Sequence, residues 1–144
     1  MCSNDWVRRG RVLALDYGTK NVGLACCDEL GIVVRPLRSL RNLSRRKLVN
    51  HLRSVIQGNR IDTVVVGIPR NMNGTIGPAM RRAQRFVQYL RSELALPVAT
   101  VDERLSTVEA SEVWSGMSAR QQRKYGTVDS LAAAFILERF LRNE

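Results

Sequence analysis

Three short apolar runs near the start of the chain are the feature that most limits its fold. Residues 11–16, 22–27 and 32–34 are rich in Val, Leu and Ile, and a few turn-forming residues separate each run from the next. Runs of this length with such gaps are typical of strands joined as antiparallel hairpins. We therefore predict three antiparallel strands within the first 34 residues.

The rest of the chain alternates between helix and strand signals. Apolar residues at helical spacing and capping residues mark the helices, and β-branched runs mark the strands. The predicted elements are a helix over 43–57 capped by Ser44, a strand over 62–68, a helix from Pro78, a strand over 97–101, a helix from Ser106, a polar basic loop over 116–126 and a final helix after Thr127. The order β-β-β-α-β-α-β-α-α predicts an α/β fold with a mixed sheet and helices on both faces.

The length of 144 residues is typical of one domain. We expect residues 1–10 to form a flexible N-terminal arm and residues 11–144 to form a single domain. No apolar run approaches the roughly 20 residues that cross a bilayer, so no membrane partner is expected. The three cysteines, two of them adjacent, make a poor disulfide framework and indicate a reducing compartment, and we expect a cytoplasmic protein.

The charge of the chain is strongly unbalanced. It carries 23 Lys and Arg against 13 Asp and Glu, a formal net charge of +10, and 20 of the 23 cations are arginine. A basic excess of this size attracts polyanions, chiefly nucleic acid, and the planar guanidinium group donates two hydrogen bonds to a phosphate. The alternative is an arginine-rich codon usage that serves no binding role.

Four carboxylates follow predicted strands or open a predicted helix. Asp16 ends the first strand, Asp102 and Glu103 end the last, and Asp129 opens the last helix. Parallel strand ends meet at one edge of an α/β sheet, so these side chains meet there if the first strand is central. Clustered acids require cations, and two Mg²⁺ ions held there would activate water and stabilise the leaving oxygen of a phosphodiester. Each acid alone could instead cap a turn or a helix.

Residues 16–23 also allow a nucleotide-binding interpretation. The pattern D-x-G-T-x-x-x-G opens sugar kinases and actin-like ATPases, in which it wraps nucleotide phosphates; here Gly18 permits a close turn and Thr19 offers a hydroxyl. Those proteins need two such domains and a second nucleotide motif, and neither glycine-rich phosphate motif occurs in this chain. ATP binding is therefore the weaker interpretation.

Four stretches together resemble a known family. They are LALDYGTKNVGLA over 13–25, VVVGIPRNMNGT over 64–75, VDERLSTVEA over 101–110 and VDSLAAAFILERFL over 128–141. In this order they are similar to the YqgF (RuvX) family of Holliday-junction-resolvase-like or pre-16S rRNA nucleases, over about residues 11–141. The resemblance implies a ribonuclease H-like fold with a five-stranded mixed sheet, and a divalent-metal nuclease linked to maturation of the 16S rRNA 5′ end.

The resemblance also implies roles for single residues. Asp16, Glu103 and Asp129 would be catalytic; with Asp102 they would hold Mg²⁺ or Mn²⁺ in a two-metal site, and Glu103 is preferred over Asp102 because related resolvases often use Glu there. The residues expected to contact nucleic acid are Gly18, Thr19, Lys20, Arg70, Asn71, Arg104, Arg120, Arg123 and Lys124.

Two positions depart from the pattern of the family. Arg70 stands where many members carry Leu and would add a phosphate contact, whereas Asn73 stands where many carry Asp. Asn73 removes a charge from a loop expected near the site, so it is not assigned as a metal ligand.

We therefore expect a hydrolase that cuts phosphodiester bonds in structured RNA. The resemblance favours precursor 16S rRNA as substrate and the ribosome or its assembly intermediates as partners, with the protein acting as a monomer or homodimer. One alternative is a Holliday junction resolvase acting on branched DNA. The other is a nucleic-acid-binding factor without catalytic activity.

Overall fold

A five-stranded mixed sheet forms the centre of the molecule. The computed structural model describes residues 10–42, 44–68, 77–102 and 106–142. The strands are β1 (Arg11–Tyr17), β2 (Asn21–Cys27), β3 (Val34–Arg41), β4 (Ile61–Ile68) and β5 (Val98–Asp102). Their order in the sheet is β3-β2-β1-β4-β5; β1–β2 and β2–β3 pair antiparallel, and β1–β4 and β4–β5 pair parallel. The predicted mixed sheet is confirmed, and the first strand is central in it.

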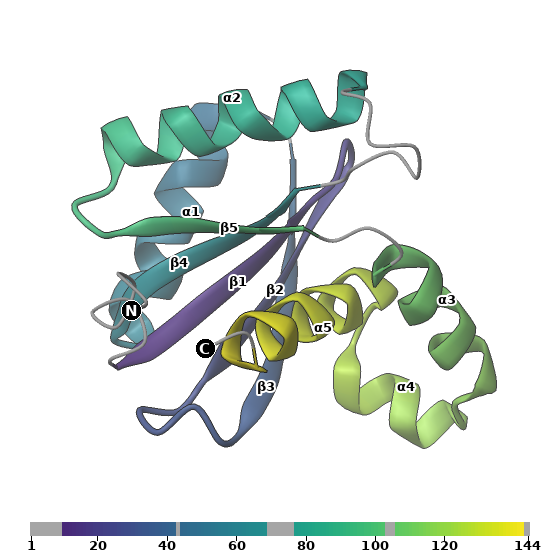
Figure 1. Cartoon of the computed structure of the whole chain (residues 1–144). Helices are drawn as coiled ribbons and strands as arrows, with labels where there is room; N and C mark the ends of the chain where they lie inside the picture. The colour runs from purple at the N-terminus through teal and green to yellow at the C-terminus, as the bar shows by residue number, and fades with distance from the viewer. Residues whose placement is uncertain (1–9, 43, 69–76, 103–105, 143–144) are drawn as a thin grey trace.

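Helices cover both faces of this sheet (Figure 1). The helices are α1 (Arg45–Gly58), α2 (Pro78–Glu93), α3 (Ser106–Gly116), α4 (Ala119–Tyr125) and α5 (Val128–Arg142). Side chains of α1 and α2 pack on one face, and side chains of α5 pack on the other. Helix α3 lies against the outer side of α5, so α5 is enclosed between the sheet and a further layer.

Alternation along β1 assigns each of its side chains to a face. Leu13 and Leu15 pack with α1 and α2, whereas Val12 and Ala14 pack with α5. Successive strand residues point to opposite faces, so Asp16 lies on the α5 face. The adjacent Cys26 and Cys27 divide between the two cores in the same way, and burial raises the pKa of the Cys27 thiol.

The third antiparallel strand is confirmed, but its predicted bounds of 32–34 are wrong. Ile32 and Val33 are 73% and 60% exposed, and their backbone N–H groups donate to the Asp28 carboxylate in the β2–β3 turn. These hydrogen bonds hold the pKa of Asp28 below its ordinary value. The strand begins at Val34 and includes Pro36, which an edge strand tolerates because its outer N–H positions need no partner.

The polar loop predicted over 116–126 is also wrong, because it contains α4. Ser118 and Gln121 form a capping box: the Ser118 hydroxyl accepts from the Gln121 N–H, and the Gln121 side chain accepts from the Ser118 N–H. This S-x-x-Q signal begins a helix that has no buried face, so an apolar period could not reveal it. The cap Thr127 of the final helix is confirmed, since its hydroxyl accepts from the Ser130 N–H at 3.1 Å.

Two expectations concern the ends of the chain and membranes. Apart from Gly10, the predicted N-terminal arm lies outside the described residues. Within the described part of the chain, no helix has the length and apolar character that crossing a membrane requires.

Candidate active site

Asp16 occupies the centre of the sheet, near the end of β1. Its side chain is only 8% exposed, on the face that α5 covers. Across the β1–β2 pair, its partner is Gly23. A carboxylate at this depth is costly unless protein groups or cations stabilise its charge.

Gly23 lets the start of α5 come down onto the sheet beside Asp16. A Cβ atom at Gly23 would lie 1.9 Å from the carbonyl oxygen of Asp129 and 2.9 Å from the Ser130 nitrogen. No side chain fits in that space, so only glycine permits the approach. The backbone of Asp129 therefore lies over the residue that pairs with Asp16, and both acids are on the same face of the sheet.

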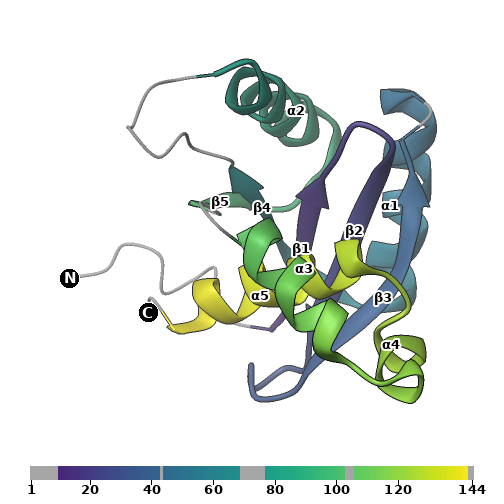
Figure 2. The ribbon, with the colours of Figure 1, turned by 90° about the vertical axis from the view of Figure 1, so that its right-hand side faces the viewer.

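Ser130 holds the first turn of α5 in this position. It is fully buried, and its hydroxyl donates to the Leu37 carbonyl of β3 at 2.6 Å. Leu37 lies beside an irregularity in the β2–β3 register, between Val22 and Leu24. The edge strand thus contributes a backbone acceptor that fixes the helix carrying Asp129. Figure 2 shows the start of α5 between the sheet and α3–α4.

Burial raises the pKa of Asp129 above its ordinary value, because desolvation disfavours the charged form. Its place in the first turn of α5 acts in the other direction, since a helix N-terminus favours negative charge. Two partly or fully buried carboxylates on one face suit a divalent cation with a preference for oxygen ligands. The described residues contain no group of three side chains able to hold a metal ion, and Glu103 lies outside them.

Asp102 lies on the opposite face of the sheet from Asp16. Its neighbour Val101 packs in the α5 core. Asp102 itself lines a hollow of about 390 Å³ against α2, together with Gln84 and Arg91. Its backbone carbonyl accepts a hydrogen bond from the Arg139 guanidinium of α5. The structure thus brings the backbone of Asp129 close to Asp16 on one face of the sheet, and it places the Asp102 side chain on the other face.

The residues predicted to contact nucleic acid fall into three groups. Gly18, Thr19 and Lys20 form the β1–β2 turn, in which the Gly18 N–H donates to the Asn21 carbonyl at 3.0 Å. The cations of α4 are exposed and lie beyond α5, away from this turn (Figure 2); they are Arg120, Arg123 and Lys124. The third group lies outside the described residues and comprises Arg70, Asn71 and Arg104.

Sequence reasoning missed three residues that position the candidate site, namely Gly23, Ser130 and Leu37. Gly23 had a usable signal, because a glycine inside a strand pattern marks a close backbone approach. Ser130 had a weaker one, as a lone polar residue at the start of a buried apolar run. The acceptor Leu37 had none, since the β3 strand itself was misplaced.

Comparison with known proteins identifies the family. A family model described as RuvX, Holliday junction resolvase, matches residues 10–143. The chain belongs to the RuvX family. Among RuvX relatives, a protein of Geobacillus sp. (strain WCH70) is 40% identical over 91% of this chain and 96% of its own length. A relative from Koribacter versatilis is 40% identical over 92% of this chain and 86% of its own length. Both are named as pre-16S rRNA nucleases.

Solved structures agree with the fold of this RuvX member. The fowlpox virus Holliday junction resolvase aligns with a TM-score of 0.57 and 14% identity, over 93% of this chain and 99% of its own. The yeast mitochondrial Holliday junction resolvase aligns with a TM-score of 0.53 and 12% identity, over 92% of this chain and 78% of its own. The expected ribonuclease H-like fold and the membership in a nuclease family are confirmed.

Proposed function

We propose that this protein is a metal-dependent nuclease that hydrolyses phosphodiester bonds in structured RNA. The observation that carries the proposal is the close approach of the Asp129 backbone to Gly23, the strand partner of Asp16, on one face of the sheet. Membership in the RuvX family supports it. A carboxylate pair of this kind in a basic protein suits metal-assisted cleavage of a polyanion.

The proposed substrate is the 5′ region of precursor 16S rRNA. Two supports are the names of the relatives with about 40% identity and the net charge of +10. Such a nuclease would work on ribosome assembly intermediates, which in bacteria places it in the cytoplasm. The nuclease would act as a monomer or a homodimer, and a measurement of its mass in solution distinguishes the two.

Asp16 and Asp129 would hold Mg²⁺ or Mn²⁺, with Glu103 as the third carboxylate. The chemistry that a pair of such ions supplies is activation of water and stabilisation of the leaving oxygen. The chain contributes a fixed geometry: Asp16 is held by the central strand, and Asp129 by the Ser130–Leu37 hydrogen bond. Helix α5 shields the floor of the site from bulk water, which strengthens electrostatic interactions there.

A cleavage assay tests this function. Purified full-length protein is incubated with precursor 16S rRNA leader fragments in Mg²⁺ or Mn²⁺, with and without chelator. We expect metal-dependent cleavage, and we expect Asp16→Asn to reduce the rate by at least about 10³-fold, because it removes a buried metal ligand. Glu138→Gln, an exposed carboxylate on the same helix as Asp129, is the matched control and should cleave normally.

The outcome that contradicts the proposal is equally specific. Cleavage by Asp16→Asn at the wild-type rate would remove Asp16 from the mechanism. Tight RNA binding by the wild-type protein without turnover in either metal would favour the non-catalytic binding factor instead.

The second candidate function is resolution of Holliday junctions. The description of the family model and the names of the fowlpox and yeast neighbours favour it. A four-way DNA junction in the same assay separates the two functions, because a resolvase cuts opposite strands symmetrically. Faster symmetric cutting of the junction than of the rRNA leader would assign the protein to branched DNA.

A further inference from the structure

The positive charge of the chain is concentrated in two segments. Residues 30–61 contain eight Lys and Arg and no Asp or Glu, and residues 113–128 contain three and none. The other residues contain twelve cations and thirteen acids, so their formal charges nearly cancel. An ordinary solvated surface mixes both signs, and these two segments do not.

The fold brings these distant segments together. The first contains the edge strand β3 and helix α1, and the second contains α4. Between β3 and the α4–α5 junction lies a hollow of about 420 Å³. Its walls are residues 36–39 of β3 on one side, and residues 124–127 with Ser130 on the other. Arg38 and Lys124 line it from opposite sides, and both are exposed.

The hollow adjoins the start of α5, the helix that carries Asp129. Thr127 and Ser130 line it, and Asp129 lies between them in the first turn of α5. The hydrogen bond from the Ser130 hydroxyl to the Leu37 carbonyl joins the two walls at this end. A chain bound in the hollow would therefore lead toward the α5 face of the sheet, where Asp16 lies.

We propose that the hollow between β3 and α4 binds the phosphodiester backbone of the RNA strand next to the scissile bond. This rests on the proposed nuclease function. Its volume is within the range of about 300–1,000 Å³ for sites that enclose small ligands, so it admits a nucleotide unit of a single strand. The Arg38 guanidinium offers two parallel donors to one phosphate, and the Lys124 ammonium offers a compact charge to a second.

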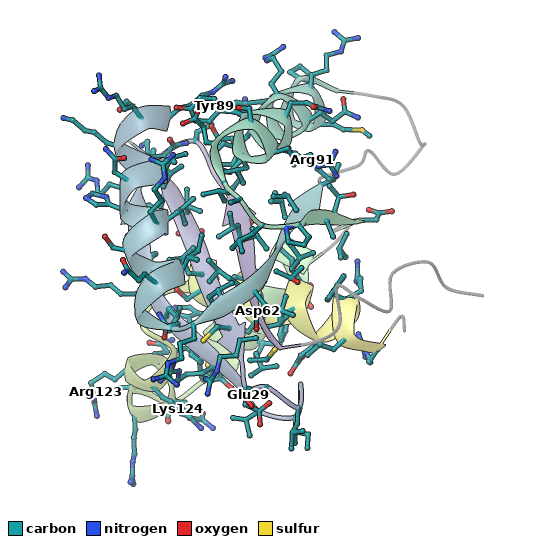
Figure 3. The ribbon with its side chains drawn as sticks, turned by 90° about the vertical axis from the view of Figure 1, so that its left-hand side faces the viewer. Glu29, Asp62, Tyr89, Arg91, Arg123 and Lys124 are labelled. Carbon is teal, nitrogen blue, oxygen red and sulfur yellow. The ribbon has the colours of Figure 1, made fainter. Side chains whose placement is uncertain are left out.

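Cations beyond the hollow extend the binding surface. Figure 3 shows the side chains of Arg123 and Lys124 at the lower edge of the molecule, and both are exposed. Arg35 is not part of this surface, because its guanidinium donates to the Asn59 side chain at 2.9 Å. Beyond the hollow, the RNA would thus follow the exposed cations of α4.

Binding is tested separately from cleavage. Full-length protein in EDTA is titrated into a fluorescein-labelled RNA hairpin with single-stranded flanks, and anisotropy gives Kd at several salt concentrations. We expect Arg38→Gln with Lys124→Gln to weaken binding by about tenfold or more and to lower the salt slope by about 0.7–0.9 per lost phosphate contact. The matched control is Arg142→Gln, an exposed cation about 20 Å along α5 from Asp129. It should change Kd less than twofold.

A second variant tests the hollow rather than the charge. Ser39→Trp fills the space and leaves every cation in place; we expect it to weaken binding, because the RNA strand no longer fits between Arg38 and Lys124. Circular dichroism and thermal unfolding show that each variant is folded. A DNA hairpin of the same sequence measures the preference for ribose.

The proposal is overturned if the Arg38/Lys124 double variant, or folded Ser39→Trp, keeps the wild-type Kd. Loss of binding in these variants supports it even if the wild-type protein cleaves no RNA, because EDTA removes catalysis from the measurement. Failure of the nuclease function and failure of this binding site therefore give different results.

Discussion

At the residue scale, Asp129 is a carboxylate whose burial opposes stability when it is ionised. Burial raises its pKa, so the folded protein binds a proton at this carboxyl more tightly than the unfolded chain does. Its stability contribution is complete below the ordinary pKa of 3.8 and is lost as pH rises through the raised value. Without a cation, ionised Asp129 therefore destabilises the fold at neutral pH.

Replacing Asp129 with Asn, a neutral side chain of nearly equal size, tests this directly. In EDTA at neutral pH, Asp129→Asn should unfold at a higher temperature than the wild-type protein, and the difference should vanish as pH falls below the ordinary aspartate pKa. Scanning calorimetry across this pH range measures it. A variant less stable than wild type at neutral pH would show that the favourable helix N-terminus outweighs desolvation.

A bound cation should reverse the order of stabilities. Mg²⁺ or Mn²⁺ stabilises a folded state that binds it. Adding either ion should therefore raise the unfolding temperature of the wild-type protein and leave Asp129→Asn nearly unchanged. An equal rise in both proteins would show that Asp129 does not bind the ion.

At the scale of the element, the approach of α5 to β2 depends on one missing side chain. Gly23→Ala would place a Cβ 1.9 Å from the Asp129 carbonyl, so the first turn of α5 must move away from Asp16. We expect a loss of about 1–3 kcal/mol in the free energy of unfolding, as for overpacked cores, together with a clear loss of cleavage rate. Urea unfolding and the cleavage assay measure the two effects.

Gly58 provides the matched control for this substitution. It ends α1, and a Cβ there meets nothing within 4 Å. Gly58→Ala should keep full activity and should not destabilise the protein, because alanine reduces the freedom of the unfolded chain. If Gly23→Ala behaved like Gly58→Ala, the close contact would have no part in positioning Asp129.

Elements with a local signal were predictable from sequence, and elements that depend on their surroundings were not. The strand β4 and the capped helices α1 and α5 follow from β-branched runs and from Ser44 and Thr127. The strand β3 does not, because it contains Pro36 and three arginines, and only its place at the edge of the sheet makes it stable. Helix α4 begins at a capping box and lacks the apolar stripe on which sequence reasoning depends.

The candidate site likewise contains residues that were predictable from sequence and residues that were not. The positions of Asp16 and Asp129 are predictable because strand ends and helix starts can be read locally, and the structure has both at those places. The same rule predicts Asp102 at a strand end, but the local sequence does not determine which face of the sheet its side chain occupies. Gly23 and the Ser130–Leu37 hydrogen bond join residues distant in sequence, so only the folded chain reveals them.

At the scale of the whole molecule, the two cores on the sheet contain many more buried apolar residues than the outer layer of α3 and α4. The cores contain all five strands, with α1 and α2 on one side and α5 on the other. A third, small cluster joins α3 and α4 to the outer side of α5 through Ala110 and Trp114 of α3, Tyr125 of α4 and Leu131 of α5. Helix α4 has no buried residue. Segments with few buried apolar contacts open locally before the rest of the structure unfolds.

Native-state hydrogen exchange should therefore find two levels of stability. Amides of α4 should exchange through local opening at a free energy well below that of global unfolding, while amides of the central strands β1 and β4 exchange only by global unfolding. Low urea concentrations distinguish the two, since local opening exposes little surface and responds weakly to denaturant. Protection of α4 equal to that of β1 would contradict this separation. If it holds, the wall of the hollow that carries Lys124 opens without disturbing Asp16 or the start of α5, so the proposed RNA-binding surface would adapt to its ligand while the candidate active site stays in place.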